Sequence, residues 1–373
     1  MSTDLVYKFF QLYSEASEVI YQPRNSWGAH EMALGAVLGI ISDIPVFYYG
    51  PPGTGKTTMV ERIARALRER FRYYLLTKFT EPDEIFGVAD LAAIRQGKYR
   101  RVTKGTALDA GVVFFDEFFN ASSAILNTLL GVLWNRVFIN GDEVVKVDWL
   151  GVFGASNRVP DEEELQALYD RFGIRVFVGR VLDVRALWRD ERNISVAITR
   201  EEVEQMRQKV REVERRGRVD FDKINAAVNK LDQMGIYVSP RRLVFARRVA
   251  AAIAALFGED SFTTEDVLDA FVFVIPNRPE DVSKVREVVE EQVKSTPSMQ
   301  QLLSMIQSLD AIERDLDLLP PQNVERELGE IRRKATQTFS SRREKAALAT
   351  LYQKIDAIEK KLKQKKEGKT QTK

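Results

Sequence analysis

The stretch Val46-Phe-Tyr-Tyr-Gly50-Pro-Pro-Gly-Thr-Gly55-Lys56-Thr57 decides the fold of this chain. Its four apolar and aromatic residues predict a buried strand, and the segment after them fits the pattern G-x-x-x-x-G-K-[ST]. Glycines let the backbone turn its N–H groups inward around the oxygens of a phosphate. The helix expected after Lys56 points the positive end of its dipole at the same place. The stretch therefore predicts a loop that binds the phosphates of a nucleotide.

The residues around this loop predict an α/β domain. Nearly continuous apolar runs alternate with helical patterns, such as those at residues 57–70 and 122–134. Continuous runs are typical of parallel strands that are buried on both faces, and the alternation indicates a parallel sheet. The runs are VFYY (46–49), YYLL (73–76), VVFF (112–115), WLGVFGAS (149–156) and IRVFV (174–178).

Two acidic residues follow the third of these runs. Asp116 and Glu117 come about sixty residues after Lys56, so a parallel sheet would place them at the edge that carries the phosphate loop. We expect Asp116 and the Thr57 hydroxyl to hold Mg²⁺, and Glu117 to polarise the attacking water. Lys56 would reach the β- and γ-phosphates of ATP. The predicted nucleotide-binding residues are Gly50, Pro51, Pro52, Gly53, Thr54, Gly55, Lys56, Thr57 and Thr58.

Two further polar residues have an ordinary and a catalytic interpretation. Asn157 ends the next apolar run, where it either makes a turn or orients the attacking water and the γ-phosphate. Arg171 ends a predicted helix, where it either interacts with the helix dipole or serves as an arginine finger across a subunit interface. Arg175 is the next candidate for that finger.

Composition excludes several kinds of chemistry. The chain has no cysteine, which excludes disulfides, iron–sulfur clusters and thiol nucleophiles, and one histidine, which excludes multi-histidine metal sites. Its 56 basic and 54 acidic residues leave a net charge of +2, which gives no global electrostatic case for binding nucleic acid. The sequence shows no run of ~20 apolar residues and no leader pattern, so we expect a cytoplasmic protein without a membrane segment.

Helical patterns dominate after the α/β region. Thr199 with Glu202, and Thr263 or Thr264 ahead of an acidic turn, are typical helix starts within an all-helical domain. From residue 291, apolar residues recur at helical spacing on either side of Pro320-Pro321, which predicts a helical hairpin and a Lys-rich tail. This hairpin either packs against the helical domain or a neighbouring subunit, or recruits a partner or client.

Taken together, the motifs resemble an AAA+ ATPase of the MoxR family, nearest its RavA branch. The resemblance spans roughly residues 25–290. It is carried by the loop 50–57, Asp116-Glu117 and the stretches 77–87, 97–105, 124–130, 135–141, 155–157, 167–171 and 238–242.

The resemblance implies a role for several residues. Asn157 matches sensor 1, Arg171 the arginine finger, and Arg241, or else Arg242, sensor 2. It also implies three parts: an α/β domain over residues 1–182, a helical lid over 183–290 and a C-terminal extension over 291–373. Within the first part, residues 91–103 match a helix-2 insert and residues 137–147 a hairpin before sensor 1, with a type I′ turn at Asn140-Gly141.

The resemblance further implies a function. Such proteins form homo-oligomeric rings, expected to be hexameric, and hydrolyse ATP to remodel a protein client, with a partner that carries a von Willebrand factor A domain. Two alternatives stay open from the residues themselves. A nucleic-acid translocase could use Lys98, Arg100, Arg101 and Lys104 as a basic pore loop, and a nucleotide-gated scaffold would need binding without turnover.

Overall fold

The computed structural model describes residues 3–19, 28–160, 163–179, 194–294, 297–314, 316, 319–335, 348 and 351–363. The chain divides into two compact units, residues 1–286 and 287–373. The predicted boundary between residues 182 and 183 lies outside the described residues.

Five parallel strands form the central sheet of the first unit, in the order β2-β3-β6-β1-β7. This confirms the predicted α/β class with a parallel sheet. Non-consecutive strands are neighbours, as crossover helices require. The strands are β1 (Val46–Tyr49), β2 (Phe71–Leu75), β3 (Val112–Asp116), β6 (Gly151–Ser156) and β7 (Ile174–Phe177).

Strand β2 departs from the prediction that every apolar run is buried on both faces. Arg72, Tyr73 and Leu75 are exposed, whereas the first four residues of β3 are buried. The physical reason is position, because β2 lies at the edge of the sheet and pairs only with β3. A continuous apolar run therefore does not distinguish an edge strand from a central one.

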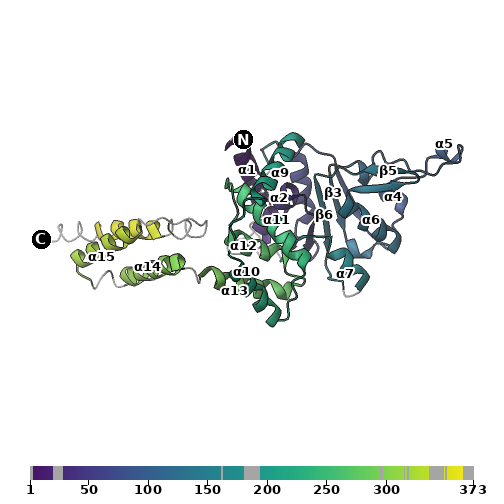
Figure 1. The fold of residues 1–373 in the computed structure, drawn as a ribbon. Helices are drawn as coiled ribbons and strands as arrows, with labels where there is room; N and C mark the ends of the chain where they lie inside the picture. The colour runs from purple at the N-terminus through teal and green to yellow at the C-terminus, as the bar shows by residue number, and fades with distance from the viewer. Residues whose placement is uncertain are drawn as a thin grey trace. The chain divides into compact units, whose positions relative to one another are not determined.

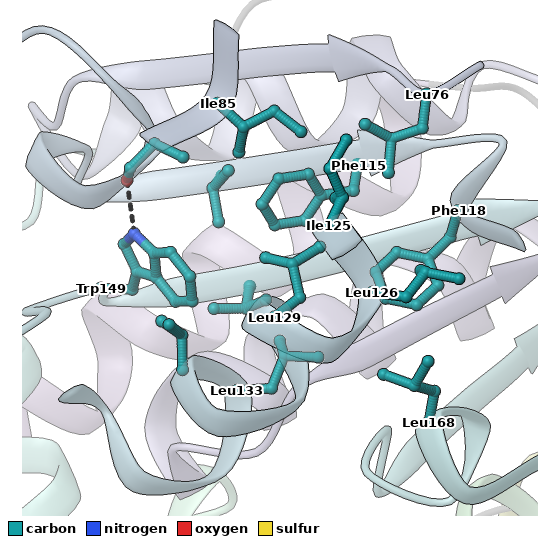
Figure 2. Packing of buried hydrophobic residues seen from close by; sticks show 14 of the residues in the cluster. Leu76, Ile85, Phe115, Phe118, Ile125, Leu126, Leu129, Leu133, Trp149 and Leu168 are labelled. Carbon is teal, nitrogen blue, oxygen red and sulfur yellow. Dashed lines mark hydrogen bonds between the residues drawn. The ribbon is translucent and has the colours of Figure 1, made fainter. Parts of the chain in front are cut away.

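Helices cover both faces of the sheet, and Figure 1 shows α2 and α6 on opposite sides of its strands. On one face, Phe47 and Phe115 pack with Ile125 and Leu129 of α6, and the Trp149 indole donates a 2.7 Å hydrogen bond to the Ala107 carbonyl (Figure 2). The helices of this α/β part are α1 (Thr3–Val19), α2 (Gly28–Ser42), α3 (Lys56–Ala66), α4 (Pro82–Phe86), α5 (Leu91–Ile94), α6 (Ser123–Asn135) and α7 (Glu163–Tyr169).

Two elements project together from this core, as the α5 and β5 labels of Figure 1 show. One is the insert around α5, whose flanks pair through the bridge Ala89–Arg101. The other is the hairpin of β4 (Val137–Asn140) and β5 (Glu143–Lys146). The Asn140 side chain joins them, since it accepts a 2.7 Å hydrogen bond from the Arg101 N–H and donates a 3.1 Å bond to the Arg101 carbonyl.

The turn of this hairpin is not the one predicted. Asn140 pairs with Glu143, so the central residues are Gly141 and Asp142, rather than Asn140 and Gly141. Only Gly141 has a positive φ, 68°, whereas a type I′ turn needs a positive φ at both central positions. Asn140 is held in the strand because its side chain bonds the insert.

Between residues 194 and 286, helices pack against the α/β core, where α9 and α11 contact α2 and α12 contacts β7. The predicted capping box of Thr199 and Glu202 is confirmed at the start of α9, and of the two predicted starts of α12 the structure has Thr263, in a capping box with Asp266. The helices are α9 (Arg200–Glu214), α10 (Phe221–Gln233), α11 (Pro240–Leu256), α12 (Thr264–Val274) and α13 (Pro279–Lys294).

The second unit has its own apolar core. It contains α14 (Pro297–Arg314), α15 (Pro321–Lys334) and helical residues 351–363, which share buried side chains such as Leu309, Val324 and Ile355. The two-helix pattern missed α15, which begins at Pro321 because proline is well tolerated in a first turn. Residues 364–373 of the Lys-rich tail lie outside the described residues. In the described part of the chain, no helix has the length and apolarity needed to cross a bilayer.

Candidate nucleotide-binding site

The phosphate loop connects β1 to α3, as the sequence predicts. Gly55 lies at the start of α3 with φ 81°, and Gly53, at the crest of the loop, has φ 75°. Both values lie in the left-handed region that glycine adopts without strain. A Cβ at Gly53 would meet no atom within 4 Å, so the loop borders open space at this residue.

Lys56 lies inside the curve of the loop. Its Nζ donates hydrogen bonds to the carbonyls of Gly50 (3.0 Å) and Pro51 (2.8 Å). Burial lowers the pKa of Lys56, whereas the charges of Asp116 and Glu117 raise it. The loop thus holds a buried cation beside two carboxylates. A phosphate bound in the loop would bring further negative charge to this cation.

The first turn of α3 supplies backbone donors at the same place. The first intrahelical bond runs from the Met59 N–H to the Gly55 carbonyl at 3.0 Å. The N–H groups of Lys56, Thr57 and Thr58 therefore precede the helical ladder, as the first donors of any helix do. Donors in this position bind anions well.

Asp116 ends β3 and Glu117 follows it, at the carboxyl edge of the sheet where β1 leads into the phosphate loop. The Tyr73 hydroxyl donates a 3.2 Å hydrogen bond to Asp116 Oδ2. Burial and the Asp116 charge raise the pKa of Tyr73 to about 12, so this hydroxyl stays a donor at neutral pH. The sequence pattern did not identify Tyr73, because nothing in an edge strand marks which side chain reaches the neighbouring strand end.

Glu117 has φ 51° and ψ 43°, a left-handed conformation that is uncommon for a residue with a side chain. The short helix at residues 118–120 follows it directly, and Phe118 and Phe119 are buried there. Burial and the Asp116 charge raise the pKa of Glu117, whereas the Lys56 and Arg158 charges lower it. A carboxylate with a raised pKa that lies beside the expected metal ligand Asp116 is suited to accept a proton.

These residues fit Mg-ATP. Thr57 and Asp116 offer a hydroxyl and a carboxylate oxygen, the hard donors that Mg²⁺ prefers when phosphates and water complete its shell. No group of three or more His, Asp or Glu side chains that could hold a metal occurs among the residues that the structure describes.

Asn157 follows β6, between β3 and β1, and is exposed. The neighbouring Ser156 carbonyl accepts a 3.1 Å hydrogen bond from the Gly50 N–H, which ties this strand end to the phosphate loop. Arg158, which the sequence pattern missed, donates a 2.8 Å bond to the Phe119 carbonyl. Asn157 thus lies at the same edge as Lys56 and Glu117.

Arg171 and Arg241 do not join this cluster within one chain. Arg171 precedes β7, whose first residue Ile174 pairs with Val46 at the start of β1, so it lies at the amino edge of the sheet. The phosphate loop follows the other end of β1, on the order of 10 Å further along the strands. Arg241 belongs to the same amino edge, because its Nη1 lies 2.6 Å from a carboxylate oxygen of Asp170.

Arg175 and Arg242 have structural roles instead. Arg175 lies 3.7 Å over the Tyr169 ring and donates to the Tyr169 carbonyl, with 2% of its side chain exposed. Arg242 is also buried and donates to Asp170 and to the Phe172 and Val274 carbonyls. Both guanidinium groups are buried in this conformation, whereas Arg241 is exposed and Arg171 is partly exposed.

The burial of Arg242 leads to a stability prediction. Arg242→Ala leaves two buried carbonyls and part of Asp170 without a donor, so we expect a loss of about 3–5 kcal/mol of unfolding free energy. Arg241→Ala removes an exposed pair, for which about 1 kcal/mol or less is expected. Urea denaturation of both variants measures the difference, and equal midpoints would contradict the assigned roles.

Comparisons with known proteins show which family and which fold this chain resembles. Residues 28–213 match the family model of the MoxR domain in the MoxR-vWA-beta-propeller ternary systems. Two relatives from Methanocaldococcus jannaschii are each 31% identical, the uncharacterized proteins MJ0079 (62% of this chain and 62% of the relative) and MJ0812 (67% and 68%). The chain thus spans less than two thirds of MJ0079 and about two thirds of MJ0812.

A solved structure from Cytophaga hutchinsonii, described as a candidate ATPase, has a similar fold. Its TM-score is 0.60 at 18% identity, over 79% of this chain and 95% of that one. This likeness supports the fold class alone. From the family model and the relative MJ0812 together, the chain belongs to the MoxR family of AAA+ ATPases.

Proposed function

We propose that this chain hydrolyses ATP and, as a hexameric ring, uses the energy to remodel or activate a protein complex. One observation carries the catalytic part. Lys56, Asp116 and Glu117 lie together at the carboxyl edge of the sheet, and the charges of Lys56 and Asp116 act on the pKa of Glu117. This is the set of cation, metal ligand and general base that phosphoryl transfer to water requires.

Each residue has a proposed step. Lys56 and the N–H groups of the α3 first turn hold the phosphates, and Thr57 and Asp116 hold the metal. Mg²⁺, when bound, neutralises charge on the phosphate oxygens. Glu117 accepts a proton from the attacking water, and Asn157 orients that water.

Arg171 and Arg241 complete the site of a neighbouring subunit in this proposal. Both lie at the amino edge of the sheet, away from the phosphate loop of their own chain. Burial lowers the pKa of Arg171, as does the Arg241 charge, and Asp170 raises it. An anion from outside, such as the γ-phosphate bound by the next subunit, would share these two cations with Asp170, which already pairs with Arg241.

Charges on the projecting insert argue against a nucleic-acid translocase. Arg100 lies 2.9 Å from an Asp90 carboxylate oxygen and 3.7 Å from one of Glu143, and Arg101 pairs with Asp83. Nucleic-acid phosphates would have to compete with these carboxylates. We therefore retain a protein client as the proposed target. A cytoplasmic location and the RavA-like branch stay predictions.

A partner with a von Willebrand factor A domain is the finer part of the proposal. It rests on the name of the matched family model, which refers to MoxR-vWA-beta-propeller systems. The test compares Glu117→Gln held in ATP with Lys56→Ala as bait in cell extract, and identifies bound proteins by mass spectrometry. We expect a protein with a von Willebrand factor A domain on the first bait only. Equal recovery on both baits, or nuclease-sensitive complexes alone, would contradict the remodelling function.

A further inference from the structure

A half-open groove of about 390 Å³ lies among α4, α6 and β4, and none of the nucleotide-site residues lines it. Phe86, Val132 and Phe138, all largely buried, make its floor, and the Phe86 and Phe138 rings stack with centroids 5.5 Å apart. Exposed Asn127 and Asn135 of α6 stand along one side. The groove thus combines an apolar floor with amide groups that can bind a peptide backbone.

The backbone of β4 supplies an open edge beside this groove. The Val147 N–H donates to the Arg136 carbonyl at 2.8 Å, so the next hydrogen-bonded pairs with β5 fall at Phe138 and Asn140. The N–H and C=O groups of Val137 and Ile139 therefore point away from β5, and both residues line the groove. Within the described part of the chain, no other element bonds these groups. Such an edge accepts an additional strand.

Gly131 gives an independent indication that a polypeptide backbone can approach α6 closely. It occupies the middle of α6, lines the groove, and a Cβ added there would meet nothing within 4 Å. In α2, by contrast, a Cβ at Gly39 would overlap Val46, so internal packing explains that glycine. Glycine in the interior of a helix destabilises that helix. At Gly131 it leaves room for a backbone that approaches from outside.

We propose that this groove binds an extended polypeptide segment of the protein client, which pairs with the open edge of β4 and places apolar side chains on Phe86 and Phe138. The segment is uncharged where it lies in the groove, because Arg101 is the one charged residue of the lining and already pairs with Asp83. Asn140 bonds the backbone of Arg101, so the groove is continuous with the projecting insert. The identity of the occupant as a client rests on the proposed function.

Fluorescence anisotropy tests the proposal on the full chain carrying Glu117→Gln, held in ATP. The probe is fluorescein-labelled, carboxymethylated α-lactalbumin, a permanently unfolded polypeptide. Adding Gly131→Phe fills the groove, so we expect binding at least about 10-fold weaker. Adding Ser123→Phe, which puts the same ring on exposed α6 surface outside the groove, should leave binding unchanged.

A second pair of variants tests the strand edge without filling the groove. Ile139→Pro removes an N–H that β5 does not use, and Val144→Pro removes the N–H of its cross-strand partner, which faces the opposite edge. Weaker binding in Ile139→Pro alone supports the proposal. Thermal unfolding and light scattering establish that each variant folds and assembles.

Three results would overturn the proposal. The first is unchanged binding of the probe in assembled Gly131→Phe, and the second is an equal loss of binding in the two proline variants. The third is loss of ring assembly in Gly131→Phe but not in Ser123→Phe, which would assign the groove to a second copy of the chain. Phosphate release by the wild-type chain separates the two hypotheses. Groove-dependent binding without ATP hydrolysis would contradict the proposed function only, and hydrolysis with groove-independent binding would contradict this inference only.

Discussion

Glu117→Gln is expected to lower ATP turnover by about 10²–10⁴-fold while ATP still binds. The amide keeps the size of the side chain but cannot accept a proton from water. Lys56, Thr57 and the first turn of α3 hold the phosphates without Glu117, so affinity for ATP should persist. Phosphate release and the binding of a fluorescent ATP analogue measure the two properties separately.

The pH dependence of the wild-type chain belongs to the same prediction. Burial and the charge of Asp116 raise the pKa of Glu117. The base is active when deprotonated, so turnover should fall as the pH is lowered, and this fall should occur at a pH above the ordinary range of a glutamate.

Lys56→Ala is the control for the Glu117→Gln variant, since it should lose ATP binding as well as turnover. Wild-type turnover in Glu117→Gln would exclude this residue as the base.

Arg171→Ala is expected to lower turnover on the order of 10³-fold in assembled rings, as loss of an arginine finger does at other phosphoryl-transfer sites. ATP binding by the isolated chain should not change, because Arg171 lies at the opposite edge of the sheet from the phosphate loop. The Arg171 guanidinium donates within its chain to the Ala167 carbonyl of α7. Its removal should therefore affect the neighbouring site rather than its own.

Mixed rings test whether Arg171 acts across the interface. A subunit with Arg171→Ala keeps Glu117, and a subunit with Glu117→Gln keeps Arg171. When equal amounts of the two inactive variants assemble at random, about one interface in four combines an intact base with an intact finger. Activity should therefore reappear on mixing. No recovery in rings shown to contain both variants would place Arg171 in a role within its own chain.

Local sequence signals predicted most of the elements that hold the nucleotide site, and also the starts of two helices in the helical part. The glycines of the phosphate loop, the acids after β3 and the capping residues Thr199 and Thr263 depend on backbone geometry within a few residues. Pattern alone can therefore identify them. The periodicity also located the helices of the C-terminal unit, apart from α15, which the predicted stop at Pro320-Pro321 passed over although Val324, Leu328 and Ile331 keep helical spacing.

Contacts between distant segments required the tertiary structure. Tyr73 reaches Asp116 because β2 and β3 are neighbours, and Asn140 bonds Arg101 across 39 positions of sequence. The difference between Arg241 and Arg242 has the same origin, because burial against Phe172 and Val274 separates two adjacent arginines that are identical in type. A linear pattern carries no information on which of two such neighbours faces solvent.

The phosphate loop, the proposed metal ligands Thr57 and Asp116 and the proposed base Glu117 follow from the sequence, since each depends on short-range backbone geometry at the end of a strand. Which edge of the sheet each arginine occupies, how the insert joins the hairpin, and where β4 leaves an open edge beside Gly131 follow only from the packed chain. Strand order and burial arise from long-range packing free energy summed over many residues, and no single motif encodes that sum.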